Sequence, residues 1–311
     1  MAPPHLPASG RVAEPRHATV PGAGPHLLAP LAFVLIWSSG FLVGRDVGRH
    51  ADPFWFLALR FALVALLFAG AAWLARVPWP RGARRISLHL AAGALMSGLY
   101  LGPSWWAMAQ GLGAGVMALI GALQPLFTAL IAVLVLRQRL PGRAWAGLVL
   151  GFGGVALVLW PRLQAQAGLD ALPLPVVLVA IGSILSLTVG AMVQKLPLAA
   201  GDLRSASCLQ NLGAVSVLAL MALAVGTPRW DGSAILWGYL AYAVLVLSVG
   251  GATLLIWLMR HGEATRTAAL LLVVPPLSAL QAWALLGETL TLAQLAGFAL
   301  TIAGVALARS R

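Results

Sequence analysis

The chain has 311 residues, of which 60% are hydrophobic and only 9% are charged. A soluble domain typically carries about 25% charged residues, so this composition excludes a water-soluble globular protein and predicts that lipid surrounds much of the chain. The formal net charge is +12, but the basic residues stand one to four at a time between long apolar runs, which argues against a nucleic-acid-binding surface.

Residues 1–26 are polar and rich in Pro, Gly and Ala, and we expect them to form a short disordered cytoplasmic tail. The first apolar run, residues 27–44, follows this basic segment and could be taken for a signal peptide. It is too long for the apolar core of a signal peptide and lacks a clear A-x-A site. We therefore expect it to stay in the membrane as the first span.

Ten apolar runs follow one another along the chain, each about 18 to 25 residues long and able to cross the hydrocarbon core as a helix. Helices are favoured because lipid offers no partner for backbone amides, and the runs lack the alternation typical of a membrane barrel. The sequence therefore predicts an all-α integral membrane protein with ten transmembrane helices, at residues 27–44, 54–75, 86–109, 115–136, 143–160, 172–194, 205–226, 234–258, 266–286 and 291–308.

The basic residues indicate which way these helices run. With the N-terminus in the cytoplasm, 15 of the 20 Lys and Arg residues fall on the cytoplasmic side and four on the other, and Arg60 lies inside the second span. Loops that remain cytoplasmic carry an excess of Lys and Arg. We therefore expect a multi-pass protein of a cell inner membrane with both its N- and C-termini in the cytoplasm.

The sequence matches itself without a gap when it is shifted by 150 residues. Between residues 125–157 and 275–307, 13 of 33 positions are identical, and Asp52 falls on Asp202. Since each copy contains five spans, the second copy must lie upside down relative to the first. Two inverted five-helix repeats are a transporter architecture, and we place them at residues 27–160 and 172–308.

Short patterns accompany the repeat: Trp37-Ser38-Ser39-Gly40-Phe41 in the first span, Pro125 and Pro275 in spans four and nine, and Gly287-Glu288-Thr289-Leu290 before the tenth. Together with the ten spans, they make the chain resemble the EamA-like family of the drug/metabolite transporter superfamily over about residues 30–308. The resemblance implies efflux or exchange of amino acids or other small metabolites through a cavity lined by spans one, three, four, six, eight and nine. The family usually has an acidic residue before the last span of each repeat, whereas the first copy here has Gln138.

Polar side chains at membrane depth are the candidates for substrate binding. Their neutral groups could hydrogen-bond a zwitterion or an amide, and Trp can stack on an aromatic or cationic ligand. The same Ser, Thr and Gln side chains could instead bond neighbouring helices to one another. The candidates are Trp37, Ser38, Ser39, Tyr100, Ser104, Gln124, Ser186 and Gln281.

Three prolines and one arginine are further candidates. Pro125, Pro275 and Pro276 stand inside spans four and nine, where proline frees a backbone carbonyl. They are candidate hinges because transporters bind substrates at broken helices near the midplane, and a simple packing kink is the alternative. Arg60 is either a gate or a contact for a substrate carboxylate, or else a side chain that snorkels to the interface.

All eight acidic residues lie in the tail, in loops or at span ends, so we expect no carboxylate-based proton coupling at the membrane centre. The chain has one cysteine, Cys208, and no HExxH, paired-carboxylate or Cys/His pattern. These patterns predict no metal site, no cofactor and no enzymatic activity.

Small residues recur on one face of spans five and ten and predict close helix packing. They are Gly147, Gly151 and Gly154 on one span and Gly297, Thr301 and Gly304 on the other. The helix that packs on each face could belong to the same chain or to a second copy, which would make a homodimer. In sum, we expect a small-molecule exporter or exchanger embedded in the bilayer, with a non-transporting sensor or assembly protein, or a lipid-modifying enzyme, as alternatives.

Overall fold

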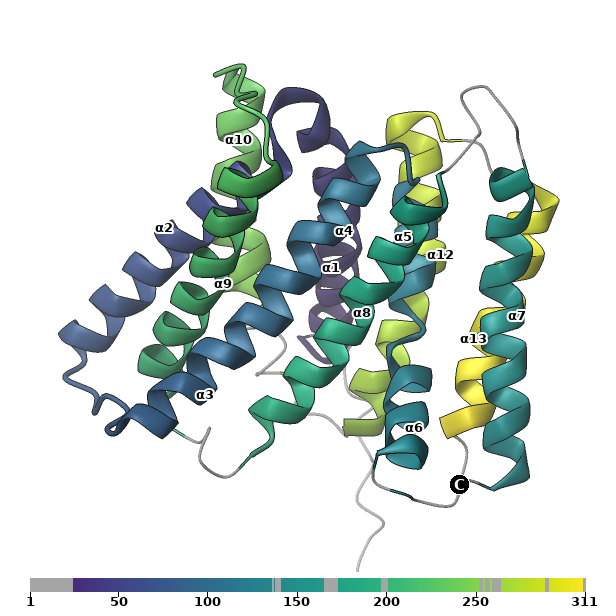
Figure 1. The fold of residues 1–311 in the computed structure, drawn as a ribbon, viewed down its shortest axis with the longest axis horizontal. Coiled ribbons are helices and arrows are strands. Elements are labelled where there is room, and N and C mark those ends of the chain that lie inside the picture. The colour runs from purple at the N-terminus through teal and green to yellow at the C-terminus, as the bar shows by residue number, and fades with distance from the viewer. Residues whose placement is uncertain are drawn as a thin grey trace, which may run out of the picture.

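The computed structural model of the chain describes residues 25–135, 137, 141–164, 173–196, 201–251, 254, 258, 264–288 and 291–309. Within these ranges every regular element is a helix, and the helices form a bundle (Figure 1). The tail expected at residues 1–26 lies outside the described residues, apart from Pro25 and His26, which begin the first helix.

The first repeat forms five membrane-spanning segments, of which the third contains a π-helical stretch and the fourth is broken in two. In chain order they are α1 (Pro25–His50), α2 (Pro53–Leu74), α3 (Ala83–Gly93) continued by η1 (Ala94–Gly98) and α4 (Leu99–Ala109), α5 (Ala114–Gly121) followed by α6 (Gln124–Leu134), and α7 (Gly142–Gln164).

The second repeat adds five more segments. They are α8 (Leu174–Gln194), α9 (Leu203–Val225), α10 (Ala234–Tyr242) continued by the π-helical η3 (Ala243–Gly250), α12 (Ala264–Leu286) and α13 (Leu292–Arg309). Among the described residues, seven helices are long and apolar enough to cross a membrane, and three shorter apolar helices accompany them. The prediction of ten helices is therefore confirmed.

The two repeats run in opposite directions (Figure 1). Helix α1 starts at the end of the bundle where α13 finishes, which we call the terminal end. Helix α8 starts at the opposite end, which we call the distal end. An odd number of spans turns the chain over between the repeats, and the predicted inversion is confirmed.

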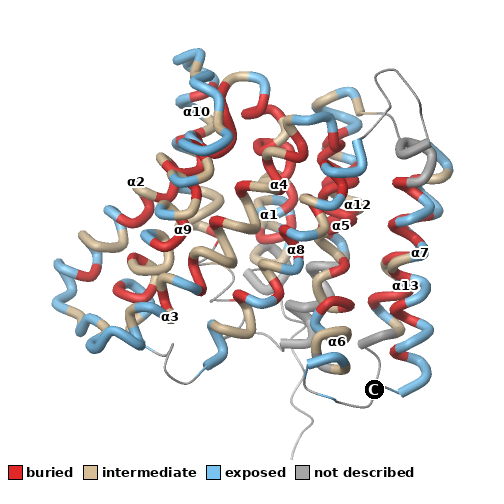
Figure 2. Tube along the Cα trace, in the orientation of Figure 1, coloured by how far each residue is buried: buried red, intermediate tan, exposed pale blue. Residues whose placement is uncertain are grey.

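Helices pair across the two repeats: α2 packs on α9, α4 on α8, α5 on α12 and α7 on α13. Buried residues lie along these contacts (Figure 2). The exposed side of the bundle is also apolar, as Leu66 and Leu220 illustrate with 68% and 67% exposure. Such a surface suits hydrocarbon, because lipid rather than water surrounds it.

The predicted small faces meet each other within this chain, between α7 and α13. A Cβ added to Gly154 would lie 2.5 Å from Oγ1 of Thr301, and one added to Gly304 would lie 2.4 Å from the amide nitrogen of Gly151. The Thr301 hydroxyl donates to the Gly151 carbonyl at 3.3 Å. Glycine is required there because the two backbones nearly touch.

Aspartates that occupy matching positions in the repeats begin the second span of each repeat. Oδ1 of Asp52 accepts hydrogen bonds from the amides of Phe54 at 2.9 Å and Trp55 at 3.2 Å. Oδ1 of Asp202 accepts one from the Arg204 amide at 2.9 Å. Both aspartates cap helix amides that would otherwise lack a partner. The same N-cap is therefore present in both repeats.

Candidate functional site

The fourth span is broken beside one of the predicted hinges. Helix α5 ends at Gly121 and α6 begins at Gln124, with Pro125 in its first turn. Proline is tolerated there because the amide it lacks would have no partner in the first turn. Its counterpart Pro275 and the adjacent Pro276 lie inside the continuous helix α12. The two repeats therefore differ at this point, and the hinge role stays a prediction.

Both repeats contain a π-helical segment at the same place. Segment η1 covers residues 94–98 and η3 covers residues 243–250, and a shift of 150 residues brings them into register. π-Helical turns are rare and are frequent at functional sites. The apolar pattern of these spans contains no signal for them, so only the structure reveals them.

Hydroxyl groups connect spans one, eight and nine inside the bundle. Oγ of Ser39 lies 2.7 Å from the Tyr242 hydroxyl, and Ser278 donates to the Ser38 carbonyl at 3.3 Å. Ser38 and Ser39 also donate to the carbonyl three residues earlier in α1, at 3.1 Å and 2.7 Å. We call Ser38, Ser39, Tyr242 and Ser278 the polar seam. Two of the predicted site residues, Ser38 and Ser39, belong to it, and the fold adds Tyr242 and Ser278 to them.

Spans three and six are joined in a similar way. Oγ of Ser104 lies 2.8 Å from Oγ of Ser183, and Ser186 donates to the carbonyl of Leu95 in η1 at 3.0 Å. These bonds are those expected if the predicted serines hold helices together. Binding of a substrate by Ser104 or Ser186 stays a prediction.

Arg60 lies in the bundle interior and is only 6% exposed. Its Nε donates to Oγ of Ser248 in η3 at 3.1 Å. The guanidinium carbon lies 5.1 Å from the ring centre of Phe61 and 5.8 Å from that of Trp105, which are cation–π distances. No ion pair to a carboxylate involves Arg60 in the described part of the chain. This burial does not fit a side chain that snorkels to water.

Gln281 lies on α12, three residues beyond Ser278 of the polar seam. Its Oε1 atom is buried and has no hydrogen-bond partner among the described residues. A buried acceptor without a partner costs about 1–3 kcal/mol. Gln281 therefore has a free acceptor that a hydrogen-bond donor from a ligand could satisfy.

The remaining predicted binding residues lie on spans one, three and four. The ring of Trp37 is 5.3 Å from that of Phe33, and the residue is 37% exposed. Tyr100 packs half-buried against the apolar core, and Gln124 is half-buried at the start of α6. Within the described ranges no side-chain hydrogen bond joins these three residues to one another, so hydrogen bonds do not unite all the candidates into one cluster.

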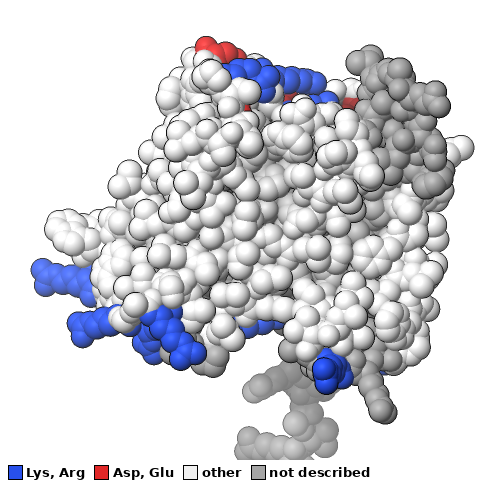
Figure 3. All heavy atoms as spheres, in the orientation of Figure 1, with Lys and Arg blue, Asp and Glu red and all other residues white. Residues whose placement is uncertain are grey.

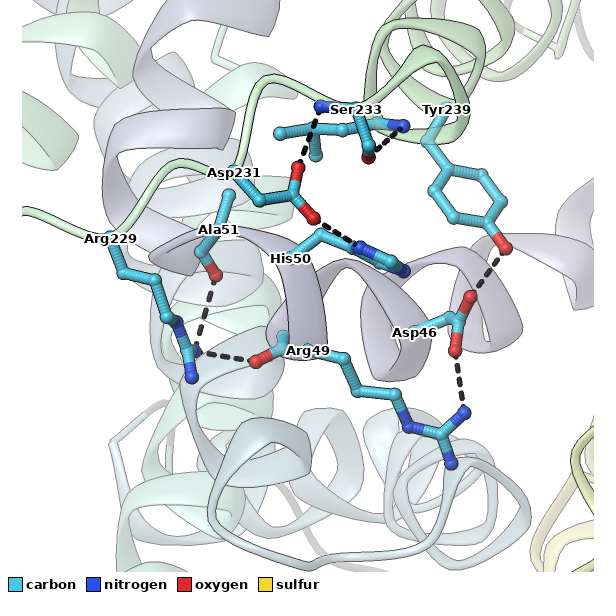
Figure 4. Close-up of polar contacts among 10 residues, drawn as sticks. Asp46, Arg49, His50, Ala51, Arg229, Asp231, Ser233 and Tyr239 are labelled. Atoms are coloured by element: carbon cyan, nitrogen blue, oxygen red, sulfur yellow. Dashed lines mark hydrogen bonds and ion pairs between the residues drawn. The ribbon is translucent and has the colours of Figure 1, made fainter.

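Sequence reasoning missed a charged cluster at the distal end, which we call the distal network: Asp46, Arg49, His50, Asp231 and Tyr239. The Tyr239 hydroxyl donates to Oδ2 of Asp46, and Arg49 pairs with Oδ1 of Asp46 at 2.8 Å (Figure 4). Nδ1 of His50 lies 2.6 Å from Oδ2 of Asp231. Charges at span ends were its only sequence signal, because Asp231 and Tyr239 stand 181 and 193 positions from their partners.

We call the loop between α9 and α10, residues 226–233, the distal loop. It is hydrogen-bonded to the corner between α1 and α2. The Arg229 guanidinium donates to the carbonyls of Gly48 and Ala51 (Figure 4). Oδ2 of Asp52 accepts hydrogen bonds from the Thr227 amide at 2.8 Å and hydroxyl at 3.2 Å. Asp52 thus caps its own helix and holds the other repeat.

Glu288 joins spans one, four and nine at the same end. Its Oε1 accepts a hydrogen bond from the Ala114 amide at 3.0 Å and lies 3.7 Å from Nε of Arg45. Arg45 also donates to the Met108 carbonyl at 3.0 Å. A carboxylate at the start of α5 is favoured by the helix dipole. Gln138, which matches Glu288 in the first repeat, lies outside the described residues.

An open hollow lies at each end of the bundle. The distal one has a volume of about 740 Å³ and is lined by Asp52, Trp106, Gln110 and Thr227, among others. The terminal one has a volume of about 420 Å³. Within the described ranges, no group of three or more His, Cys, Asp or Glu side chains could hold a metal ion.

The sequence matches the EamA-like transporter family twice, over residues 25–160 and 174–310. It is 28% identical over 300 residues to a probable amino-acid metabolite efflux pump of Salmonella typhimurium, covering 88% of this chain and 91% of that relative. A crystal structure of a protein shares the fold with a TM-score of 0.59 and 19% identity, over 91% of this chain and 96% of that chain. With both repeats matched, the chain belongs to the EamA-like transporter family and is a multi-pass membrane transporter.

Proposed function

We propose that this transporter exports amino acids, or closely related metabolites that carry a carboxylate, by alternating access between its two inverted repeats. Arg60 is the observation that supports this best. It is a buried cation with aromatic and hydroxyl neighbours and, within the described residues, no ion pair to an acidic side chain. A buried charge without a counterion is costly, and a substrate carboxylate would supply charge-assisted hydrogen bonds.

An amino acid also carries an ammonium group, which needs hydrogen-bond acceptors. The polar seam offers the hydroxyl oxygens of Ser39 and Tyr242, and α12 offers the free Oε1 atom of Gln281. The helices that carry these groups are neighbours, since α1 packs against α10 and α12, and α2, which carries Arg60, packs against η3, the continuation of α10. Cation and acceptors on adjoining helices suit a zwitterion.

The direction of transport and the substrate class have separate support. The Salmonella relative is named a probable amino-acid metabolite efflux pump, which favours export of this class. Inverted repeats allow the two halves to exchange conformations about a central site. The break beside Pro125 and the paired π-helical segments are where we expect the helices to bend. Because the carboxylates lie at span ends, we propose no carboxylate-based proton coupling at the centre.

We also propose that the terminal end faces the cytoplasm in an inner membrane. Lys and Arg side chains gather at the terminal end, whereas acidic side chains accompany the basic ones at the distal end (Figure 3). This is the expected charge bias. In intact cells, a membrane-impermeant maleimide should label Pro228→Cys of the distal loop and leave Arg81→Cys unlabelled. The reverse pattern would contradict the orientation.

Counterflow in proteoliposomes tests the substrate. The purified protein is loaded with a pool of amino acids, and exchange is measured with labelled amino acids and with their decarboxylated amines. We expect saturable exchange of an amino acid and none of its amine. Loss of charged hydrogen bonds should raise the KM of Arg60→Gln about tenfold or more, and Arg60→Lys should keep part of the affinity.

Arg143→Gln, which removes an exposed arginine on α7, is the matched control and should exchange like the wild type. Elution profile and melting temperature establish that each variant is folded. Equal losses for amino acids and amines in Arg60→Gln would contradict a carboxylate contact. If the wild type exchanges no compound in the pool, amino acids are not the substrate and the proposal fails.

A further inference from the structure

The hollow at the terminal end lies where α2 ends and the loop of residues 75–82 begins, which we call the terminal loop. Its lining combines two tryptophans with an arginine and apolar groups: Ala72, Trp73, Leu74, Arg76, Val77 and Trp79. Trp73 and Leu74 are 77% and 76% exposed, so the hollow has an open apolar side. Tryptophans at this level are typical of the boundary between lipid tails and headgroups.

One arginine, Arg76, lines this hollow, and three more arginines follow within nine residues of it in the chain. Arg76 and Arg81 belong to the terminal loop, Arg84 and Arg85 to the first turn of α3, and all four are exposed. In the described part of the chain, the ion pairs of arginine involve only Arg45 and Arg49 at the distal end. Figure 3 shows basic side chains gathered at the terminal end near α2 and α3.

The positive charges near the hollow repel one another, and no acidic side chain in the described ranges forms an ion pair with them. The first turn of α3 contains two arginines and no acidic residue, and Gly82 before it offers no side-chain cap. Cations are disfavoured at this end of a helix because the dipole is positive there. An external anion would relieve this cost. The unpaired arginines and the hollow suggest where it would bind.

The terminal loop is held in one shape. The Arg76 amide donates to the Trp73 carbonyl at 3.0 Å, and the Val77 amide donates to that of Ala72 at 3.1 Å. Ser205 at the start of α9 donates to the Pro78 carbonyl at 3.0 Å, which ties the loop to the other repeat. A loop ordered before binding loses less entropy when a ligand arrives.

We propose that this hollow binds the headgroup of an anionic phospholipid, with the phosphate near Arg76 and its neighbouring arginines and the glycerol and acyl chains against Trp73 and Leu74. Basic pockets beside transmembrane helices are suited to such headgroups. The exposed apolar side favours a lipid over a soluble anion, which would leave that side uncovered. The inference goes beyond the proposed function and holds for any transported substrate.

Native mass spectrometry of the detergent-purified protein tests the proposal. Phosphatidylglycerol and phosphatidylcholine are titrated separately, and bound lipid is counted. We expect the wild-type protein to bind phosphatidylglycerol more tightly than phosphatidylcholine. Arg76→Gln should weaken this binding about fivefold, and replacement of all four arginines by Gln more than about a hundredfold. Arg143→Gln is the control and should bind like the wild type.

A second variant separates a lipid from a soluble anion. Trp73→Ala/Trp79→Ala keeps every charge but removes the aromatic walls, and it should also bind less phosphatidylglycerol. Unchanged binding by this variant, or displacement of the lipid by inorganic phosphate at equal concentration, would overturn the proposal. So would an equal loss in Arg143→Gln, because it would indicate diffuse attraction rather than a site.

Discussion

The terminal and distal loops occupy matching positions in the two repeats. The charged side chains of the distal loop have partners in the protein, whereas those of the terminal loop have none among the described residues. A shift of 150 residues places Arg76 on Gly226 and Arg81 on Asp231. In the distal loop, Arg229 and Asp231 bond to the α1–α2 corner. In the terminal loop, the arginines are exposed and form no ion pair among the described residues.

This difference shows that two inverted repeats can share the path of the backbone while their side chains make different interactions. Both ends use an aspartate to begin a helix, but among the described residues only Asp52 also accepts hydrogen bonds from a loop of the other repeat, through Thr227 of the distal loop. The distal end therefore pairs Asp46, Asp52 and Asp231 with groups of the protein itself. The terminal end leaves its cations for something outside the protein, which is consistent with a surface that meets anionic headgroups.

The largest expected effect comes from the two capping aspartates. Asp52→Ala should lower the free energy of unfolding by about 2–3 kcal/mol, because it removes a helix cap and two hydrogen bonds to Thr227. Asp202→Ala removes one capping bond and should cost about 1 kcal/mol. Unfolding by SDS in mixed micelles, followed by tryptophan fluorescence, measures both. If both variants lost the same free energy of unfolding, the claim that Asp52 has additional bonds at the distal end would be contradicted.

Tyr239 and His89 occupy matching positions in the two repeats, but only Tyr239 has a hydrogen-bond partner among the described residues. Tyr239→Phe should lower the free energy of unfolding by about 1 kcal/mol, because it removes the hydrogen bond to Asp46. His89 is fully buried and neither ring nitrogen has a partner in the described structure. His89→Leu should therefore be neutral or stabilising in the same unfolding assay, since it removes two unsatisfied polar atoms. A clear destabilisation would show that His89 has a partner in another conformation.

A smaller effect is expected at Glu288. The Arg45 and Glu288 side chains are 24% and 23% exposed and 3.7 Å apart, so their coupling should stay below about 1 kcal/mol. A double-mutant cycle with Arg45→Gln, Glu288→Gln and the double variant measures this coupling by unfolding. A coupling well above this value would mean that this contact, and not Asp52, dominates the distal end.

The smallest effect is a pH dependence at Asp231. The Ser233 amide, and then the His50 side chain, lower the pKa of Asp231 below its ordinary value of 3.8. Since the folded state favours the charged form, the contribution is complete above pH 3.8 and is lost as the pH falls through the lowered pKa. Asp231→Asn should thus be slightly less stable than the wild type near neutral pH and indistinguishable from it in strong acid. A difference that persists in acid would contradict this assignment.

The sequence alone determined the features that depend on local pattern and length. Apolar runs long enough to cross the bilayer, and the 150-residue register, specify ten helices in two inverted repeats, since lipid excludes other backbone structures. The small faces containing Gly154 and Gly304 likewise predicted close packing, because only glycine lets two backbones approach so closely.

Only the tertiary structure decided which partner each side chain meets. The small faces of α7 and α13 pack on one another in this chain, although a second copy could have supplied the partner. Ser104 and Ser186 bond to neighbouring helices, and Arg60 lies between aromatic rings and Ser248. The hydrogen bonds of Ser104, Ser186 and Arg60 join residues 79 to 188 positions apart. They depend on how each helix is rotated and paired, and hydrophobic periodicity alone does not encode that choice in a chain that is apolar on nearly every face.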